Sequence, residues 1–441
     1  MRKYMPYILC STLLVLASTF TFAEKYKTVN KPVNDKFIKK YGRSFFDVKN
    51  INPFPIPHVL DRIDNKGKIT TAQEWNNIAR PQILNFYDEQ VYGAIPPRPD
   101  SINFELLESS KDALGGIAER RQYRITVSAK YGSRDINVLF YLPKGATKDV
   151  PTFVYTNFAG NYAMSPEEEV FRIEPPKTKG KNLKRGRQAT RLPIADIVAR
   201  GFAVATHCYE DLYPDDKSQK AFKQSIYQIF ANRNSFPQGG AISAWAWGNM
   251  RVMDLLQTIP ELDKQKIAIV GHSRLGKTAI LTGVHDKRFA YIIANNSGCM
   301  GDALSKRYYG ESLGSMVKIN FPYWFMPALA KYADNEGELP LDQHHLLATI
   351  APRMLYTTSA TKDEWADPEG QLLGLINACP AFALFGAKNF PTLDALEIEK
   401  PFHGDVAYHI RRGKHSITPY DWNNFMDYAQ KRGWKPVLPK K

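Results

Sequence analysis

KIAIVGHSRLGK, residues 266–277, is the stretch that decides how this chain folds. Residues 267–270 form a short apolar run rich in β-branched side chains, which is typical of a strand buried on both faces. Gly271 and Gly276 then bracket a sharp turn, and the residues after it suit a helix. The stretch therefore predicts a buried strand, a tight turn that carries Ser273, and a helix.

A serine on a sharp strand-to-helix turn is how α/β-hydrolases hold their nucleophile above the sheet. In the common G-x-S-x-G pattern residue 275 is glycine, whereas this chain has Leu275 there and a glycine one place later. A G-x-S-x-x-G spacing also arises by chance, and a serine before a helix can simply cap that helix. Ser273 is thus a candidate nucleophile whose role depends on the rest of the chain.

The chain alternates strand-like and helical segments from Pro151 onward. Strands are predicted over residues 152–156, 202–206, 267–270, 290–294, 354–358 and 406–410, and helices over 194–200, 240–256, 371–385 and 419–432. This alternation predicts an α/β-hydrolase fold, a three-layer sandwich with a mostly parallel central sheet and inserted loops around the active site. A helical stretch at 71–91 and strand-like runs at 102–107, 122–127 and 137–142 come before it, and the last two runs suit an antiparallel entry into the sheet.

The first 23 residues have the features of a secretory signal peptide: a basic start, an apolar stretch, and small residues at positions 21 and 23. We expect residues 24–441 to form a single catalytic domain, with an N-terminal extension over about residues 24–100. No other apolar span reaches the roughly 20 residues that a membrane helix needs. We therefore expect an exported protein, periplasmic or secreted, without stable membrane insertion and monomeric.

Cysteine usage gives no sign of a disulfide framework or a metal centre. Removing the signal leaves Cys208, Cys299 and Cys379, and an odd number of thiols leaves room for one bridge or none. The sequence has no C-x-x-C or H-E-x-x-H spacing, which argues against zinc. We expect neither a metal nor an organic cofactor.

The formal net charge of +15 favours approach to anionic surfaces or polymers. The sequence contains no recognised nucleic-acid-binding motif, and most basic residues are dispersed, so we expect no nucleic-acid partner. Residues 167–191 form an insertion with three acids followed by many lysines and arginines. It is either a basic rim for an anionic polymer or a solvated loop. A second insertion, residues 321–347, carries aromatic side chains that either shape a pocket wall or belong to the core.

A serine nucleophile needs an imidazole to take its proton and an acid to orient that imidazole, in the chain order serine, acid, histidine. The strand at 354–358 is followed by three acids, Asp363, Glu364 and Asp367. The last strand is followed by a glycine and His415. This order of strand-terminal residues favours Ser273 as a nucleophile over a helix cap.

The other histidines fit this role less well. His403 precedes the last strand, His409 lies within it, and His344 and His345 lie in a connecting segment. His272 adjoins the serine, and we expect its side chain to point away from Ser273. His415 is therefore the candidate base.

GHSRLGK, residues 271–277, resembles the Gly-Cys-Ser-Arg-x-Gly-Lys motif of the glucuronoyl esterases, carbohydrate esterase family 15, in which bacterial members often carry histidine at the position of His272. The resemblance extends to residues 157–161, 295–311, 363–368 and 408–422 (YHIRRGKHSITPYDW) and covers most of the mature chain. It implies a carboxylic ester hydrolase of the 4-O-methyl-glucuronoyl methylesterase type. Members of the family cleave esters between 4-O-methyl-glucuronic acid on xylan and alcohols of lignin.

The resemblance also implies roles for individual residues. Arg274 matches the arginine that helps to stabilise the oxyanion beside the backbone N–H after the serine. Lys277, Glu311 and Trp365 match positions that contact the hydroxyls or the face of the uronate. Without the resemblance, Lys277 and Glu311 would be read as a solvent-facing helix residue and a surface acid.

The catalytic acid is where this sequence departs from part of the family. Fungal and some bacterial members place a glutamate after the sixth strand, and the aligned residue here is Asn296, which cannot carry the charge. Other bacterial members use an acid after the seventh strand, and Asp363 matches that position. We choose Asp363, with Glu364 and Asp367 as alternatives, and expect Asp367 to cap the following helix.

The sequence thus predicts an exported serine esterase acting on glucuronoxylan or lignin–carbohydrate esters. Two alternatives remain open at this point. One is another serine carbohydrate esterase of the acetyl xylan or feruloyl type. The other is a non-catalytic α/β-hydrolase that binds acidic polysaccharide.

Overall fold

The structure, a computed structural model, describes residues 54–177, 179–231, 239–393 and 397–440. The predicted signal peptide at residues 1–23, and the part of the N-terminal extension before residue 54, lie outside the described residues. Among the residues that are described, no helix has the length and apolar character to cross a membrane.

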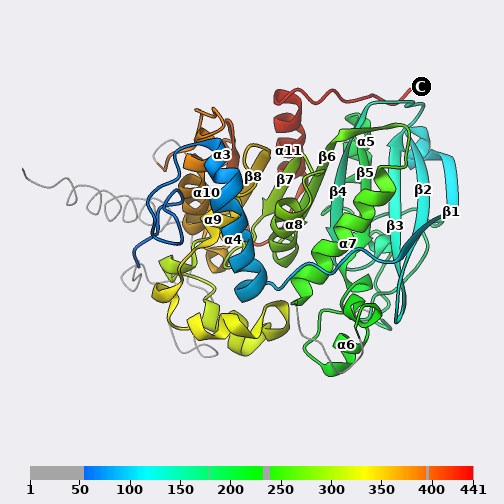
Figure 1. Ribbon diagram of the computed structural model, residues 1–441. Coiled ribbons are helices and arrows are strands. Elements are labelled where there is room, and N and C mark those ends of the chain that lie inside the picture. Colours follow the sequence, from blue (N-terminus) through cyan, green and yellow to red (C-terminus); the bar gives the residue numbers. More distant parts are fainter. Residues whose placement is uncertain (1–53, 178, 232–238, 394–396, 441) are drawn as a thin grey trace, which may run out of the picture.

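The described strands form one mixed sheet in the order β1-β2-β3-β5-β4-β6-β7-β8-β10-β9 (Figure 1). Their bounds are β1 (Ser101–Ala113), β2 (Ala118–Ala129), β3 (Gly132–Pro143), β4 (Val150–Asn157), β5 (Ala203–Cys208), β6 (Leu262–His272), β7 (Tyr291–Asn295), β8 (Met354–Ala360), β9 (Phe402–His403) and β10 (Ala407–Arg411). The six neighbouring strands β5-β4-β6-β7-β8-β10 all run parallel to one another. The first three strands enter antiparallel, as predicted, and β9 pairs antiparallel with β10 at the far edge.

Helices cover both faces of this sheet. The described helices are α3 (Ala72–Glu74), α4 (Arg80–Phe86), α5 (Ile194–Ala199), α6 (Gln219–Lys223), α7 (Ala241–Leu256), α8 (Arg274–His285), α9 (Gln343–Ala348), α10 (Pro368–Ala383) and α11 (Pro419–Lys431). On one face α7, α8, α9 and α10 pack against the sheet and one another, whereas α5 and α11 lie on the other face (Figure 1). This confirms the predicted α/β-hydrolase sandwich.

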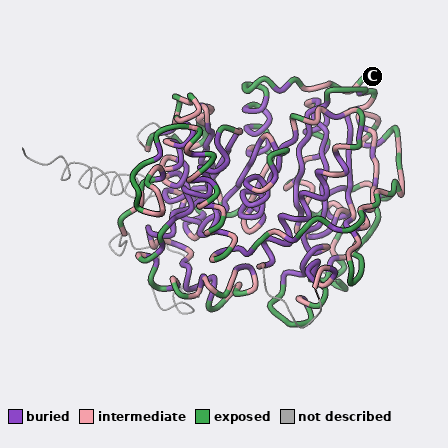
Figure 2. The backbone as a smooth tube through the Cα atoms, in the orientation of Figure 1, coloured by how far each residue is buried: buried purple, intermediate pink, exposed green. Residues whose placement is uncertain are grey.

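Strand β6 shows why the sheet is buried on both faces. Ile267 and Ile269 point into the larger apolar cluster on the α7–α8 side, while Ala268 and Val270 point into the cluster under α11. Side chains alternate across a strand, so an unbroken apolar run fills both layers. Figure 2 shows the central strands and α8 as buried and the β1 edge as largely exposed.

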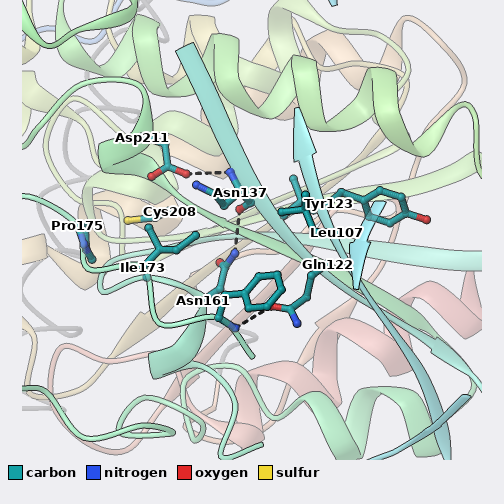
Figure 3. Close-up of a pocket in the computed structure, with 12 residues that line it drawn as sticks. Leu107, Gln122, Tyr123, Asn137, Asn161, Ile173, Pro175, Cys208 and Asp211 are labelled. Atoms are coloured by element: carbon teal, nitrogen blue, oxygen red, sulfur yellow. Dashed lines mark hydrogen bonds between the residues drawn. The ribbon is translucent and has the colours of Figure 1, made fainter. Parts of the chain in front are cut away.

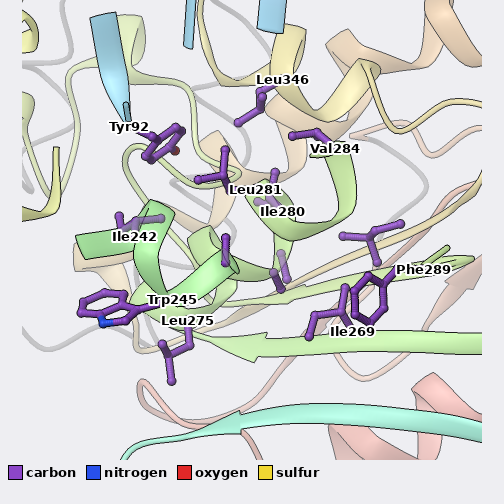
Figure 4. Packing of buried hydrophobic residues seen from close by; sticks show 14 of the residues in the cluster. Tyr92, Ile242, Trp245, Ile269, Leu275, Ile280, Leu281, Val284, Phe289 and Leu346 are labelled. Carbon is purple, nitrogen blue, oxygen red and sulfur yellow. The ribbon is translucent and has the colours of Figure 1, made fainter. Parts of the chain in front are cut away.

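The packing beneath the serine turn joins α7, α8 and β6. Leu275, at the start of α8, lies with Trp245 of α7 and Ile269 of β6 in one apolar cluster (Figure 4). All three side chains are at most 1% exposed. Leu275, at the position where the common pattern has glycine, is therefore a core residue that anchors the helix after the serine.

The predicted helical stretch at 71–91 is helical throughout. It begins at Ala72, runs through α3 and α4 and includes two π-helical turns, Trp75–Ala79 and Tyr87–Val91. Thr71 and Glu74 form a capping box at its start. Pro81 lies in the first turn of α4, which begins at Arg80.

Candidate active site

The backbone at Ser273 has φ 59° and ψ −129°, a conformation that non-glycine residues rarely adopt. The N–H of Ser273 donates to the backbone oxygen of Asn295 over 2.9 Å, which fixes the turn on the neighbouring strand β7. Ser273 occupies the N-cap position of α8, yet its side chain makes no capping hydrogen bond in the structure as described. The geometry therefore fits a nucleophile elbow and does not fit a helix cap.

Two glycines permit this turn. A Cβ on Gly271 would lie 1.8 Å from the backbone oxygen of Leu275, and a Cβ on Gly276 would lie 2.7 Å from the Cβ of Ser297. Both distances are shorter than any tolerable contact, so glycine is required at both positions. The common pattern has its second glycine at position 275. In this chain that glycine is Gly276, which lies where α8 passes the loop after β7.

Asp363 and His415 meet at the same edge of the sheet. Because β6, β8 and β10 run parallel, the residues that follow them gather at one edge. The Nδ1 of His415 lies 2.7 Å from Oδ2 of Asp363, and the carboxylate is only 4% exposed whereas the imidazole is 41% exposed. The two loops are tied together because the N–H of Lys362 donates to the oxygen of Gly413 over 2.8 Å.

Asn296 supports the same carboxylate. Its Nδ2 donates to Oδ2 of Asp363 over 2.7 Å, the oxygen that also faces His415. From the sequence, Asn296 was notable only because it cannot act as a charged acid. The structure brings Asn296 to the acid chosen in its place, and no local sequence signal predicted this contact.

His272 is a neighbour of the candidate base that the sequence analysis set aside. Its ring centroid lies 4.5 Å from that of His415, which brings the imidazole of His415 beside the residue that precedes Ser273. The Nδ1 of His272 lies 2.6 Å from Oδ1 of Asn295, whose Nδ2 donates to Thr358 and Asp421. Oδ1 must therefore accept, which puts the His272 proton on Nδ1. Burial, with His415 next in size, holds the pKa of His272 well below its usual value, so this ring is a neutral support.

The alternative acids occupy other places. Asp367 accepts from the N–H of Gly370 as the N-cap of α10, as expected, and forms an ion pair with Arg307 over 2.9 Å. Glu364 is 8% exposed and burial raises its pKa. Among the hydrogen bonds of the described residues, His415 is joined to Asp363 and not to Glu364.

Three of the other histidines make hydrogen bonds to groups other than Ser273 and Asp363. His409 is fully buried within β10, with Nε2 at 2.8 Å from Asp421 and Nδ1 at 2.8 Å from the hydroxyl of Tyr356. His403 contacts the same tyrosine hydroxyl at 3.0 Å. His344 bonds to the backbone oxygen of Pro57 at 2.8 Å, at the buried start of α9. These positions agree with core or supporting roles.

Lys277, Glu311 and Trp365 lie together, although they come from α8 and two separate loops. The Nζ of Lys277 lies 3.6 Å from Oε2 of Glu311 and also donates to the backbone oxygen of Ser297. The indole N–H of Trp365 donates to Oε1 of Glu311 over 3.2 Å, and the N–H of Glu311 donates to the oxygen of Trp365 over 2.8 Å. The lysine and glutamate side chains are 4% and 9% exposed, so the two surface readings that the sequence left open are wrong.

Arg274 turns toward a buried acid that the sequence analysis did not single out. It forms an ion pair with Asp215, and its guanidinium carbon lies 4.7 Å from the ring centroid of Trp324 and 5.4 Å from that of Phe321. The rings of Phe321 and Trp324 are stacked, 3.8 Å apart. The aromatic residues of the second insertion thus belong in part to the core, because Trp324 is buried there and packs against Arg274.

In the basic insertion, residues 167–191, the acids form ion pairs within the insertion or with the sheet. Glu167 pairs with Arg120, Glu168 with Arg185, and Glu174 with Arg172. Six of its basic residues are exposed: Arg172, Lys177, Lys179, Lys181, Lys184 and Arg187. Of these, Arg172 pairs with Glu174 and Lys177 with Asp215. The net positive charge of this loop thus faces solvent at the edge of the sheet that carries Ser273.

A pocket lies under this insertion, away from the serine (Figure 3). The Nδ2 of Asn161 donates to the oxygen of Asn137 over 2.8 Å, and Asp211 accepts from the N–H of Asn137 over 3.1 Å. Gln122 accepts from the N–H of Phe171 over 2.8 Å. The bond between Gln122 and Phe171 holds the insertion against β2, and the other two bonds tie residues 161 and 211 to β3. The lining of the pocket includes none of Ser273, Asp363 and His415, so the pocket is not the candidate reaction centre.

Metal chemistry has no ligand set in the described part of the chain. No group of three or more histidine, cysteine or acidic side chains there is arranged to hold an ion. Cys208, Cys299 and Cys379 are free and buried. Among these residues, the groups suited to chemistry at the sheet edge are the hydroxyl of Ser273, the imidazole of His415 and the carboxylate of Asp363.

Comparison with known proteins agrees with this geometry. A family model described as "Glucuronyl esterase, fungi" matches residues 188–386. The carbohydrate esterase MZ0003, from an unknown prokaryotic organism, is 34% identical over 415 residues, covering 91% of this chain and 95% of that protein. A glucuronoyl esterase from Solibacter usitatus has a structure with TM-score 0.81 at 37% identity, covering 87% of this chain and 100% of that one. A promiscuous CE15 esterase from a marine bacterial metagenome gives 0.77 at 32%, covering 87% and 98%.

The fold and the serine elbow define this protein as an α/β-hydrolase. More narrowly, the chain belongs to the glucuronoyl esterases of carbohydrate esterase family 15, as its motifs predicted, and is a carboxylic ester hydrolase.

Proposed function

We propose that this chain hydrolyses esters of (4-O-methyl-)glucuronic acid on xylan with lignin alcohols, through an acyl-enzyme on Ser273. The observation that carries the proposal is the group of Lys277, Glu311 and Trp365, which combines a cation, an anion and an indole beside the elbow. Such a group offers a donor and an acceptor for sugar hydroxyls and a flat apolar face for the ring. The names of the similar proteins agree with this substrate class.

The first half of the reaction forms the acyl-enzyme. The Oγ of Ser273 attacks the ester carbonyl while its proton passes to Nε2 of His415. The Nδ1–H of that imidazole bonds to Asp363 over 2.7 Å, and the carboxylate stabilises the imidazolium that forms. The negative charge on the carbonyl oxygen meets the guanidinium of Arg274 and the backbone N–H of Arg274 at the start of α8. The alcohol leaves with the proton from His415.

The second half releases the acid. A water molecule gives a proton to Nε2 of His415 and attacks the acyl carbon, and the same donors hold the second oxyanion. Collapse of this intermediate returns the proton to Oγ of Ser273 and frees the uronic acid. Each step uses only water and groups of this chain.

The protein that performs this reaction would be exported after loss of residues 1–23, with residues 24–441 as one catalytic unit. We propose that it acts as a monomer on glucuronoxylan or lignin–carbohydrate esters. An exported esterase meets such polymers without needing them to enter the cell.

The test compares two substrates and two serine variants. We expect the parent to hydrolyse benzyl glucuronate and to release little acetate from acetylated xylan, because the Lys277–Glu311–Trp365 group suits a uronate. Ser273→Ala should abolish turnover, while Ser133→Ala, an exposed serine in β3, should leave it unchanged. Acetate or ferulate release alone would reject the substrate class. Hydrolysis that survives in Ser273→Ala would reject the nucleophile, and a parent without any hydrolysis would favour a binding protein.

A further inference from the structure

Asp215 is a fully buried carboxylate next to the candidate oxyanion arginine. It follows β5 and the short 3-10 turn Tyr209–Asp211, at the same edge of the sheet as Ser273. Its side chain has 0% exposure. A buried charge persists only if it is paired and hydrogen-bonded, so the partners of Asp215 define its purpose.

Both oxygens of Asp215 are fully used. The Oδ2 atom accepts from Lys177 at 2.7 Å, from the hydroxyl of Tyr209 at 2.9 Å and from Nη1 of Arg274. The Oδ1 atom accepts from the hydroxyl of Tyr323 at 2.6 Å and from the indole of Trp324 at 3.0 Å. These donors come from four separate segments of the chain. The carboxylate therefore cannot rotate without breaking several contacts, and one guanidinium nitrogen of Arg274 is fixed with it.

The charge of this cluster is also set by the contacts. Burial alone would raise the pKa of Asp215, but Arg274 and Lys177 outweigh it and lower that pKa to about 2. Arg274 and Asp215 by themselves would form a neutral pair. Lys177, whose side chain is 47% exposed, adds the second cation and leaves the trio with a net positive charge.

Arg274 keeps part of its donor capacity for another partner. Among the described residues its Nε is buried and has no hydrogen-bond partner, while the guanidinium lies over the stacked rings of Trp324 and Phe321. A buried donor without a partner is costly, and it is explained when a ligand atom completes the set. Preorganised donors of this kind stabilise developing charge because they need no reorganisation during the reaction.

We propose that Asp215 is the positioning residue of Arg274, holding its guanidinium toward the oxyanion, and that Lys177 keeps this pair net positive. This inference rests on the proposed role of Arg274 in ester hydrolysis. It also gives the basic insertion a specific part in the reaction, because Lys177 belongs to that insertion. The competing explanation is that Asp215 only braces the loops that surround it.

A double-mutant cycle separates the two explanations. We would measure kcat, KM and thermal stability on benzyl glucuronate for Asp215→Asn, Arg274→Met and the double variant. Removing an oxyanion donor typically lowers kcat by ~10²–10³-fold, so Asp215→Asn should lower kcat at least about tenfold and change KM much less. In the Arg274→Met background the same change should have almost no further effect on kcat, because Asp215 acts through Arg274. Asp254→Asn, which removes a carboxylate paired with Arg251 and Arg288 far along α7, is the matched control and should leave kcat unchanged.

Lys177→Met keeps the inference testable if Asp215→Asn does not fold, since Lys177 is half-exposed. It should lower kcat several-fold in the parent and have no effect in the Arg274→Met background. Losses that multiply in the double variants, or a loss of stability with kcat intact, would show Asp215 to be only a brace. If the parent cleaves a different ester, the same cycle run on that ester still tests the positioning role, so the two proposals fail separately.

Discussion

Replacing Asp363 by asparagine should disable the candidate triad while leaving the fold intact. The variant keeps the size of the side chain and removes its charge at a site that is 4% exposed. In the parent, Oδ2 accepts both from Nδ1 of His415 and from Nδ2 of Asn296, each over 2.7 Å. The change therefore acts on the imidazole and on the neighbouring amide together.

Two losses combine in this variant. A hydrogen bond to a charged group is worth about 1.5–3 kcal/mol, so losing the charge that stabilises the imidazolium costs ~10- to 150-fold in kcat. The second loss concerns the tautomer. Among the described residues the Oδ1 of Asn296 has no hydrogen-bond partner, so this amide can rotate and accept from residue 363. Residue 363 can then present its NH₂ to His415. Nε2 then carries the proton and cannot take one from Ser273, and in other serine triads this substitution lowers kcat ~10⁴-fold.

We therefore expect Asp363→Asn to lower kcat on benzyl glucuronate by ~10³–10⁴-fold, with little change in KM or in melting temperature. Glu364→Gln is the matched control, because it neutralises the adjacent acid, and it should keep kcat within about threefold of the parent. A variant Asp363→Asn within tenfold of the parent, or a Glu364→Gln variant that loses activity, would show that the acid has been assigned wrongly.

Three further outcomes are expected. Lys277→Met should raise KM for benzyl glucuronate about tenfold and lower kcat less, because Lys277 offers the sugar hydroxyls a charge-assisted hydrogen bond. An equal effect on an acetate ester that lacks sugar hydroxyls would contradict this. Changing four exposed cations of the basic insertion, Lys179, Lys181, Lys184 and Arg187, to glutamine should raise KM on a polymeric glucuronoxylan ester at low salt but not on benzyl glucuronate. An unchanged KM on the polymer would show that these residues belong to a solvated loop. Glu336 is 1% exposed and burial raises its pKa to about 7, so the folded protein keeps a proton that the unfolded chain loses. Stability should therefore fall as pH rises from about 4 to 7, and Glu336→Gln should make the melting temperature depend less on pH over this range. A melting temperature that depends on pH as strongly in the variant as in the parent would contradict the reasoning.

The strand framework could be predicted because its signal is local. The apolar run in β6 is buried on both faces, and the later strands of the sheet have similar runs. Because these strands alternate with helices, the sequence predicted that they run parallel. Strand ends differ from the prediction where burial continues past the apolar run. Strand β6 starts at Leu262 and ends at His272, since pairing with β4 and β7 extends beyond the residues 267–270 that periodicity marks.

The supporting residues of the site could not be predicted because their contacts are distant in sequence. Asp215 lies in the segment YEDLYPDD, where four acids look alike, and its partner Arg274 is 59 residues away. Nothing in the local sequence distinguishes Asp215, which is buried, from Asp216, which is exposed. His272 was set aside for its expected direction, although its ring packs against that of His415, which follows β10.

Loops that follow two different strands meet at the candidate acid, Asp363. The loops after β7 and β8 both reach the carboxylate beside His415, since Asn296 follows β7 and Asp363 follows β8. Acids at both places would put two buried like charges within hydrogen-bonding reach of one oxygen, and one of them would hold a proton at neutral pH. An amide at position 296 avoids this repulsion and donates to the acid at 363. Asn296 and Asp363 therefore form one interacting pair, and neither residue can be interpreted without the other.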